Sequence, residues 1–184
     1  MVLNKFNSIL RDQNELLENT LVIFMSDNGA NNNGSNEHLR GYKGSLWEGG
    51  HRVPAIAFWK GRIEPGTSAE LLLGMDIFPT FVALTGNKLP EDIKLDGIDF
   101  SSVLLERGPL PERMAFWRAG GKRSIRKGPW KLLVQNDSSY LFNLSDDPSE
   151  QMNLIHENTS LYDSLQNLLL DWEAEINTYT LNTH

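Results

Sequence analysis

The run of residues 20–25 (TLVIFM) is apolar or β-branched throughout and stops at the polar sequence Ser26-Asp27-Asn28-Gly29. A strand that lacks polar alternation is typically buried on both faces, as in a parallel sheet. A second apolar run covers residues 53–59, and apolar side chains recur at helical spacing over residues 3–18. This order of helices and strands predicts an α/β fold with a parallel or mixed sheet.

The pattern changes after about residue 108. Four short strand candidates with tight turns between them follow, at residues 115–118, 124–126, 130–134 and 140–143. Apolar residues at helical spacing over residues 161–176 then predict a long amphipathic helix whose leucine stripe packs on a core. We therefore expect an α/β domain over residues 1–108, and a small antiparallel subdomain with a C-terminal helix over residues 109–184.

Composition excludes several classes of function. The chain has 184 residues, a net charge of −7 and no cysteine, so it has no disulfide and no cysteine nucleophile or metal ligand. Residues 132–184 hold nine acidic residues and no lysine or arginine, which disfavours nucleic-acid binding. The longest apolar runs are too short to span a bilayer.

Asp27 and Asn28 follow the end of the first apolar strand, where open α/β sheets bind ligands. A carboxylate beside a side-chain amide offers two hard oxygen ligands, suited to Ca²⁺ or Mg²⁺. The sequence Asp-Asn-Gly is also good turn chemistry, so this motif alone leaves a purely structural interpretation open.

Lys43 lies between Gly41 and Gly44, in a segment where the backbone can approach a ligand closely. A lysine held there can act as a point charge on an anion, although most lysines are simply solvated. His38 and His51 flank this segment and are either part of the same substrate-binding site or ordinary loop residues. No two histidines have the spacing of a zinc site.

Seven basic residues and no acidic one occur from residue 113 to residue 131. This strip is either a solvated strand face or a surface that meets an anionic substrate. We expect Trp117 and Arg118 to lie nearest a substrate, because a ring beside a guanidinium suits stacking on a sugar or an aryl sulfate. The alternative is that Trp117 is a core residue and that Arg118 pairs with an acid of the C-terminal tail.

Four motifs, in order along the chain, resemble those of the arylsulfatase-type sulfatases, a family of the alkaline-phosphatase-like superfamily. Residues 19–29 (NTLVIFMSDNG) resemble its strand and metal-binding turn, and residues 39–54 (LRGYKGSLWEGGHRVP) resemble its second signature. Residues 75–80 (MDIFPT) and 140–154 (YLFNLSDDPSEQMNL) resemble two later motifs. Because four ordered motifs are far more specific than one, the chain is identified as the C-terminal portion of a member of this family.

The resemblance implies a role for each matching residue. Asp27 and Asn28 would be two ligands of an active-site Ca²⁺ (Mg²⁺ fits less well), and Lys43 would contact the sulfate of an aryl or carbohydrate sulfate ester. The family's nucleophile is a formylglycine made from the Cys or Ser of a C/S-x-P/A-x-R motif, which these residues lack. The resemblance therefore implies a missing N-terminal part as partner, and a chain that is inactive by itself.

Two other interpretations stay open at this point. The chain can belong to a related metal-dependent phosphohydrolase of the same superfamily, or it can be a non-catalytic remnant of a sulfatase. A periplasmic or secreted location is the expectation for a full-length protein of this family.

Overall fold

The computed structural model describes residues 14–31, 33–90 and 92–181, which fall into two compact units. The first unit holds the described residues up to Met25 together with Ala55–Pro111. The second unit holds Ser26–Pro54 together with the described residues from Glu112 onward. This division differs from the boundary near residue 108 that the sequence indicated, because residues 26–54 belong with the C-terminal sheet.

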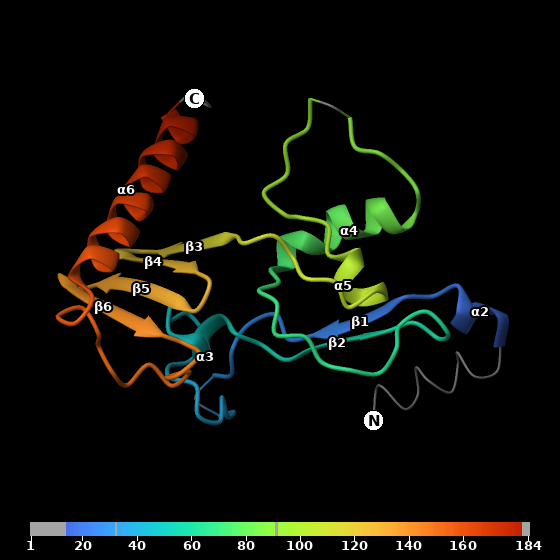
Figure 1. Ribbon diagram of the computed structural model, residues 1–184, viewed down its shortest axis with the longest axis horizontal. Helices are drawn as coiled ribbons and strands as arrows, with labels where there is room; N and C mark the ends of the chain where they lie inside the picture. Colours follow the sequence, from blue (N-terminus) through green and yellow to red (C-terminus); the bar gives the residue numbers. More distant parts are fainter. Residues whose placement is uncertain (1–13, 32, 91, 182–184) are drawn as a thin grey trace. The chain divides into compact units, whose positions relative to one another are not determined.

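The first unit combines a pair of strands with short helices (Figure 1). Its described elements are α2 (Asn14–Glu18), β1 (Val22–Met25), β2 (Ala55–Phe58), the 3₁₀ turn η1 (Gly74–Asp76), α4 (Ile77–Leu84) and α5 (Ser101–Leu105). The helix predicted over residues 3–18 is therefore described from Asn14 onward, and its earlier part lies outside the described residues.

The two strands of this unit pair antiparallel, with Met25 at the end of β1 opposite Ala55 at the start of β2. A parallel pair would need a crossover that carries the chain back along the sheet, usually in a helix. The connection from β1 to β2 contains a single helical turn, α3 (Glu48–His51), and returns the chain to the end from which it left. The prediction was a parallel or mixed sheet: this pair contradicts an all-parallel sheet, whereas a mixed sheet allows it.

The first unit buries few of its apolar side chains. Among its described residues, Phe100 and Val103 are the buried hydrophobic ones. Phe24 on β1 is 52% exposed and Ile56 on β2 is 62% exposed. The sequence predicted strands buried on both faces, and these two strands are not. Further exposed large apolar side chains of this unit are Leu16, Met25, Phe58, Leu72, Met75, Phe78, Phe81, Ile93 and Leu105.

Asp76 and Thr80, in the MDIFPT motif, are fully buried and act as polar anchors. The Asp76 carboxylate accepts hydrogen bonds from the backbone N–H groups of Leu73, at 2.7 Å, and Ile98, at 3.0 Å. The Thr80 hydroxyl accepts one from the backbone N–H of Phe100, at 3.0 Å. Asp76 is the N-cap residue of α4, but its side chain makes no capping hydrogen bond to that helix. The motif instead binds the backbone of Ile98 and Phe100, just before α5.

The second unit is a four-stranded antiparallel meander followed by a long helix, as the sequence predicted (Figure 1). Its strands are β3 (Met114–Ala119), β4 (Lys122–Lys127), β5 (Trp130–Gln135) and β6 (Ser138–Asn143), and its helix is α6 (Thr159–Leu181). Asn136 and Asp137 form the turn between β5 and β6 with φ of 50° and 60°, the backbone that a two-residue hairpin favours. No helix in the described part of the chain is long and apolar enough to cross a membrane.

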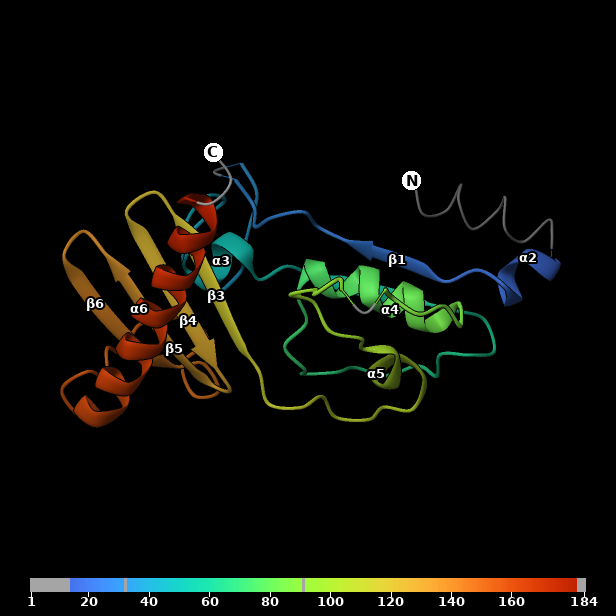
Figure 2. The ribbon, with the colours of Figure 1, turned by 90° about the horizontal axis from the view of Figure 1, so that it is seen from above.

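Both faces of this sheet are buried. On one face, Leu132 and its neighbours pack under α6, which crosses the strands (Figure 2). On the other face, Leu133 packs against Leu46 and Trp47 from the segment before α3. Because adjacent strand residues point to opposite faces, Leu132 and Leu133 belong to different cores. Residues 46–47 therefore complete the second core, which is why the connection between β1 and β2 joins this unit.

Candidate functional site

The predicted metal turn follows β1 directly and presents its carboxylate to solvent. Asp27 is exposed and Asn28 is half-buried. The hydroxyl of Ser26 donates a hydrogen bond of 2.8 Å to the backbone carbonyl of Asn28, which closes the turn. The structure thus places Asp27 where it can bind a cation and not in a core.

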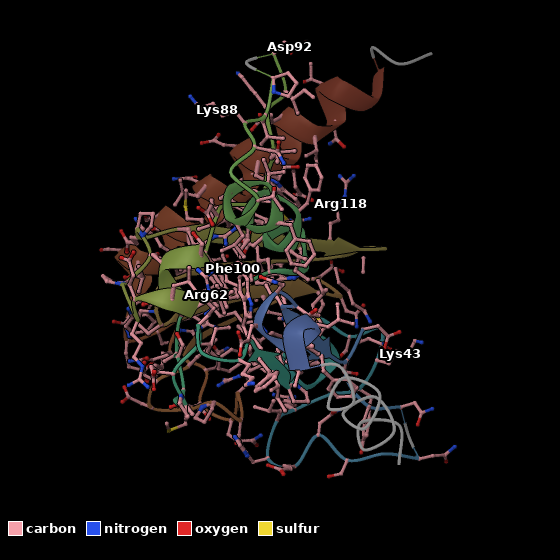
Figure 3. All side chains as sticks on the ribbon, turned by 90° about the vertical axis from the view of Figure 1, so that its right-hand side faces the viewer. Lys43, Arg62, Lys88, Asp92, Phe100 and Arg118 are labelled. Carbon is pink, nitrogen blue, oxygen red and sulfur yellow. The ribbon has the colours of Figure 1, made fainter. Side chains whose placement is uncertain are left out.

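Lys43 lies at the surface of a glycine-bounded loop (Figure 3). Gly41 and Gly44 have φ of 85° and 84°, which side chains with a Cβ rarely adopt. These two glycines turn the backbone on either side of Lys43.

Backbone hydrogen bonds join the Asp27-Asn28 turn to this loop. The N–H of Lys43 donates to the carbonyl of Ala30 at 3.0 Å, and the N–H of Gly29 donates to the carbonyl of Gly50 at 3.0 Å. A Cβ on Gly29 would lie 1.7 Å from the carbonyl oxygen of Gly49, so only glycine permits this approach. The structure therefore brings Asp27, Asn28 and the Lys43 loop together.

The donor set at this turn fits part of a calcium site. A carboxylate and an amide oxygen are ligands that Ca²⁺ accepts, but the ion takes six to eight oxygens. The described residues contain no group of three or more His, Asp or Glu side chains that could hold a metal ion. Asp27 and Asn28 can hold such an ion only together with ligands from elsewhere.

Next to this loop lies a buried charge cluster that the sequence analysis missed. Lys131 of β5 is fully buried, and its Nζ lies 2.8 Å from Oε1 of Glu48 and 2.9 Å from Oε1 of Glu150. Arg52 and Arg126 approach the other oxygen of Glu48 at 3.6 and 3.7 Å. Two buried carboxylates are thus neutralised by one buried ammonium and, at Glu48, by two partly exposed guanidinium groups.

The charges of the cluster act on one another's ionisation. Burial works to raise the pKa of Glu48, but Lys131, His51 and Arg126 together lower it below the usual value. Burial raises the pKa of Glu150, and the attraction of Lys131 offsets this only in part. Glu48 is therefore the more firmly ionised carboxylate of the pair.

His51 is part of this cluster and is not presented to solvent as a substrate ligand. Burial, followed by the nearby charge of Lys131, lowers its pKa to about 4. Its Nε2 lies 3.3 Å from Nζ of Lys131, and its ring stacks on that of Trp117. His51 is therefore a neutral, largely enclosed residue. His38 is exposed, and no hydrogen bond or ion pair among the described residues joins it to Lys43.

Trp117 and Arg118 lie on opposite faces of the sheet, because they are neighbours on one strand. Trp117 packs with the core beside Trp47, whereas Nη1 of Arg118 donates a hydrogen bond of 3.0 Å to Oδ1 of Asn177 on α6. The expectation that they form one substrate-facing pair is wrong. The alternative was closer, although the tail residue that Arg118 meets is an amide and not an acid.

The basic strip divides in the same way. Arg123 pairs with Glu173 of α6 at 3.3 Å, whereas Arg126 and Lys131 face Glu48. The sequence signal for the buried cluster was the position of Lys131 itself: it lies inside the run Trp130-Lys131-Leu132-Leu133, where a solvated lysine would be out of place.

Comparisons with known proteins agree with the motifs. The family model for Sulfatase matches residues 1–87. Arylsulfatase A of Bos taurus is 36% identical over 174 residues, which cover 76% of this chain and 34% of that protein. A sulfatase of Formosa agariphila is 33% identical over 167 residues, which cover 79% of this chain and 30% of that protein.

A solved structure shows the same fold. Ps i-CgsB in complex with k-i-k-neocarrahexaose superposes with a TM-score of 0.82 and 30% identity, over 92% of this chain and 39% of that chain. The present chain spans about a third of the length of the curated relatives that it matches. With its ordered motifs, its sequence similarity and its α/β fold of the sulfatase type, the chain belongs to the sulfatase family.

Proposed function

We propose that this chain is the part of a sulfuric-ester hydrolase that supplies two calcium ligands, Asp27 and Asn28, and a sulfate-contacting lysine, Lys43. The observation that carries the proposal is the pair of backbone hydrogen bonds that holds the Asp27-Asn28 turn against the Lys43 loop. A pair of hard oxygen ligands and a cationic side chain thereby share one locally fixed element.

Each residue has a distinct task in this proposal. A bound calcium ion would polarise the sulfate group, and Asp27 and Asn28 would hold part of its coordination shell. Lys43 would place its ammonium against the sulfate and stabilise the charge that develops on the ester oxygen. Neither a formylglycine motif nor the other metal ligands are encoded in these residues, so we propose that the chain alone does not hydrolyse sulfate esters.

The substrate that we propose is a sulfated carbohydrate. Support comes from Ps i-CgsB, which resembles this chain at 30% identity and was solved with a carbohydrate oligomer bound. An aryl sulfate serves as a convenient assay substrate for the same chemistry.

The partner that we propose is the remainder of a sulfatase catalytic domain. The exposed apolar side chains of the first unit support this, since an isolated two-stranded sheet is at best marginally stable in water. The relatives and the solved structure contain more than half of their chain outside the matched region, which is enough to cover such a surface.

Turnover of the completed enzyme tests the role of Lys43. When the chain is joined to the missing part of a sulfatase, Lys43→Ala should lower kcat on an aryl sulfate by about 10² or more, because an oriented transition-state charge is lost. Lys60→Ala is a matched control, since Lys60 pairs with Glu18 on the surface of the first unit. Unchanged turnover in Lys43→Ala would remove this residue from the mechanism.

Two further measurements test the metal and the reaction class. Calorimetry on the 184-residue chain should show only weak Ca²⁺ binding, and tight binding abolished by Asp27→Ala would contradict an incomplete shell. The completed enzyme should hydrolyse an aryl sulfate faster than the matching aryl phosphate, and the reverse preference would favour a phosphohydrolase.

A further inference from the structure

The ammonium of Lys131 finds its charged and polar partners inside the second unit. An ammonium has three N–H donors. One of them bonds to Oε1 of Glu48 at 2.8 Å; Nζ also forms an ion pair with Oε1 of Glu150 at 2.9 Å and lies 3.3 Å from Nε2 of His51. A lysine this buried is rarely found without such partners, so its position in β5 is tied to the two carboxylates.

Glu150 holds both ends of the segment that carries Lys43. Its Oε2 accepts the backbone N–H of Glu48 at 2.7 Å, and its backbone carbonyl accepts Nη1 of Arg40 at 2.9 Å. The N–H of Gly49 donates to the carbonyl of Arg40 at 2.7 Å and closes the loop between these points. Residues 40–49, the Lys43 loop, are thus closed at their base, and Glu150 is bonded to that base from both sides.

Arg40 adds a second fixation at the same base. Its guanidinium lies 3.7 Å from the ring centroid of Trp47, which is buried in the core shared with β5 and β6. The loop base is therefore held by one aromatic contact, one backbone bond and the carboxylates that Lys131 neutralises.

We propose that Lys131 is a positioning residue for the Lys43 loop: by neutralising Glu48 and Glu150 it keeps the base of the loop closed and fixes Lys43 beside the Asp27-Asn28 turn. What the loop does once fixed rests on the proposed function, but how it is fixed does not.

The physical reason is the cost of buried charge. Without the ammonium of Lys131, the carboxylates of Glu48 and Glu150 would face each other with little solvent, and removing one partner of a buried ion pair is strongly unfavourable. Local opening at the loop base is the response that costs the least free energy. Water enters there, the hydrogen bonds from Glu48 and Arg40 to Glu150 break, and Lys43 loses its fixed position.

The test is hydrogen exchange on the 184-residue chain carrying Lys131→Met, which keeps an unbranched side chain, one atom shorter, and removes its charge. We expect amide exchange in residues 40–49 and 27–31 to become at least about tenfold faster, while the amides of β6 and α6 keep their protection. Lys122→Met, on the neighbouring strand β4, is the control and should leave the loop unchanged.

Two further variants separate positioning from general stability. Lys131→Arg restores the charge and should return loop exchange most of the way to the original rate, whereas a role in filling space alone predicts no such rescue. Glu150→Gln keeps the shape and an acceptor for the N–H of Glu48, and should loosen the same residues less. It also serves as the decisive variant if Lys131→Met does not fold.

Two results would overturn the inference. One is uniform acceleration across both the loop and α6, which would make Lys131 a residue of global stability. The other is an unchanged loop in folded Lys131→Met or in Glu150→Gln. Neither result bears on whether the completed enzyme hydrolyses sulfate esters, so the two proposals fail separately.

Discussion

The indole of Trp117 lies stacked on the imidazole of His51, with ring centroids 4.6 Å apart and ring planes inclined by 28°. This contact joins β3 to α3 and closes one side of the histidine from water. The side chain of His51 keeps only 19% of its surface exposed. Burial is the largest cause of the low pKa of His51, and the stacked indole provides part of that burial.

Removal of the indole should raise the pKa of His51, because it reduces the burial of the ring. In Trp117→Ala water reaches the ring, so we expect the pKa of His51 to rise from about 4 toward 6.5, as followed by NMR titration of the imidazole. Trp172→Ala is the matched control, because Trp172 stacks on Phe116 at the opposite face of the sheet. A value that stays near 4 in Trp117→Ala would mean that Trp117 does not contribute to the low pKa of His51.

The low pKa of His51 makes stability depend on pH. Between about pH 4 and 6.5 the unfolded chain binds a proton at this residue and the folded chain does not, so stability rises with pH across this window and falls on acidification. From pH 7 to pH 4.5 the original chain should lose about 2 kcal/mol more than His51→Gln in urea unfolding. His156→Gln, at an exposed position, should lose as much as the original chain. Equal losses in all three proteins would show that His51 does not contribute.

A single methyl group should separate the Asp27-Asn28 turn from the Lys43 loop. Gly29→Ala places its Cβ against backbone atoms of Gly49, which cannot move without breaking the bond from Gly29 to Gly50. We expect a loss of about 2 kcal/mol or more in denaturant unfolding. In Gly44→Ala the new Cβ meets no atom within 4 Å. Its only cost is the strain of an alanine at a φ of 84°, about 1 kcal/mol of stability. A Gly29→Ala loss no larger than that of Gly44→Ala would contradict the close approach.

The long helix should stabilise the second unit through one stripe of its surface. Leu165 is 1% exposed beneath the sheet, so Leu165→Ala should cost about 2–5 kcal/mol in urea unfolding. Leu170 lies on the same helix and is 45% exposed. Leu170→Ala should cost well under 1 kcal/mol, and similar costs for both variants would argue against the packing described for α6.

Sequence patterns predicted the second unit well because its signals are local. Period-two alternation and two-residue turns define β3 to β6, and helical spacing of leucines defines α6. The same reasoning misjudged β1 and β2. A continuous apolar run predicts a strand but not the direction of its neighbour, which is set by the path of residues 26–54.

The candidate site was predictable to the extent that it lies in short motifs. A strand end and neighbouring glycines singled out Asp27, Asn28 and Lys43, and the resemblance to the sulfatases implied their roles. Whether they bind metal and sulfate stays a prediction. The buried cluster was not found, because Glu48, Lys131 and Glu150 lie far apart in the sequence and meet only through tertiary packing. Trp117 and Arg118 failed as a pair because strand alternation separates neighbours.

The assignment of residues 26–54 to the C-terminal sheet has a consequence for how this protein can be divided. A peptide of residues 112–184 would begin near the apparent domain boundary, yet it would lack Leu46 and Trp47 from its second core and Glu48 from its charge cluster. Lys131 would keep only one of its two carboxylates. Residues 26–54 and the meander must therefore be expressed or exchanged together as one folding unit, although the 57 residues 55–111 separate the two segments of this unit in sequence.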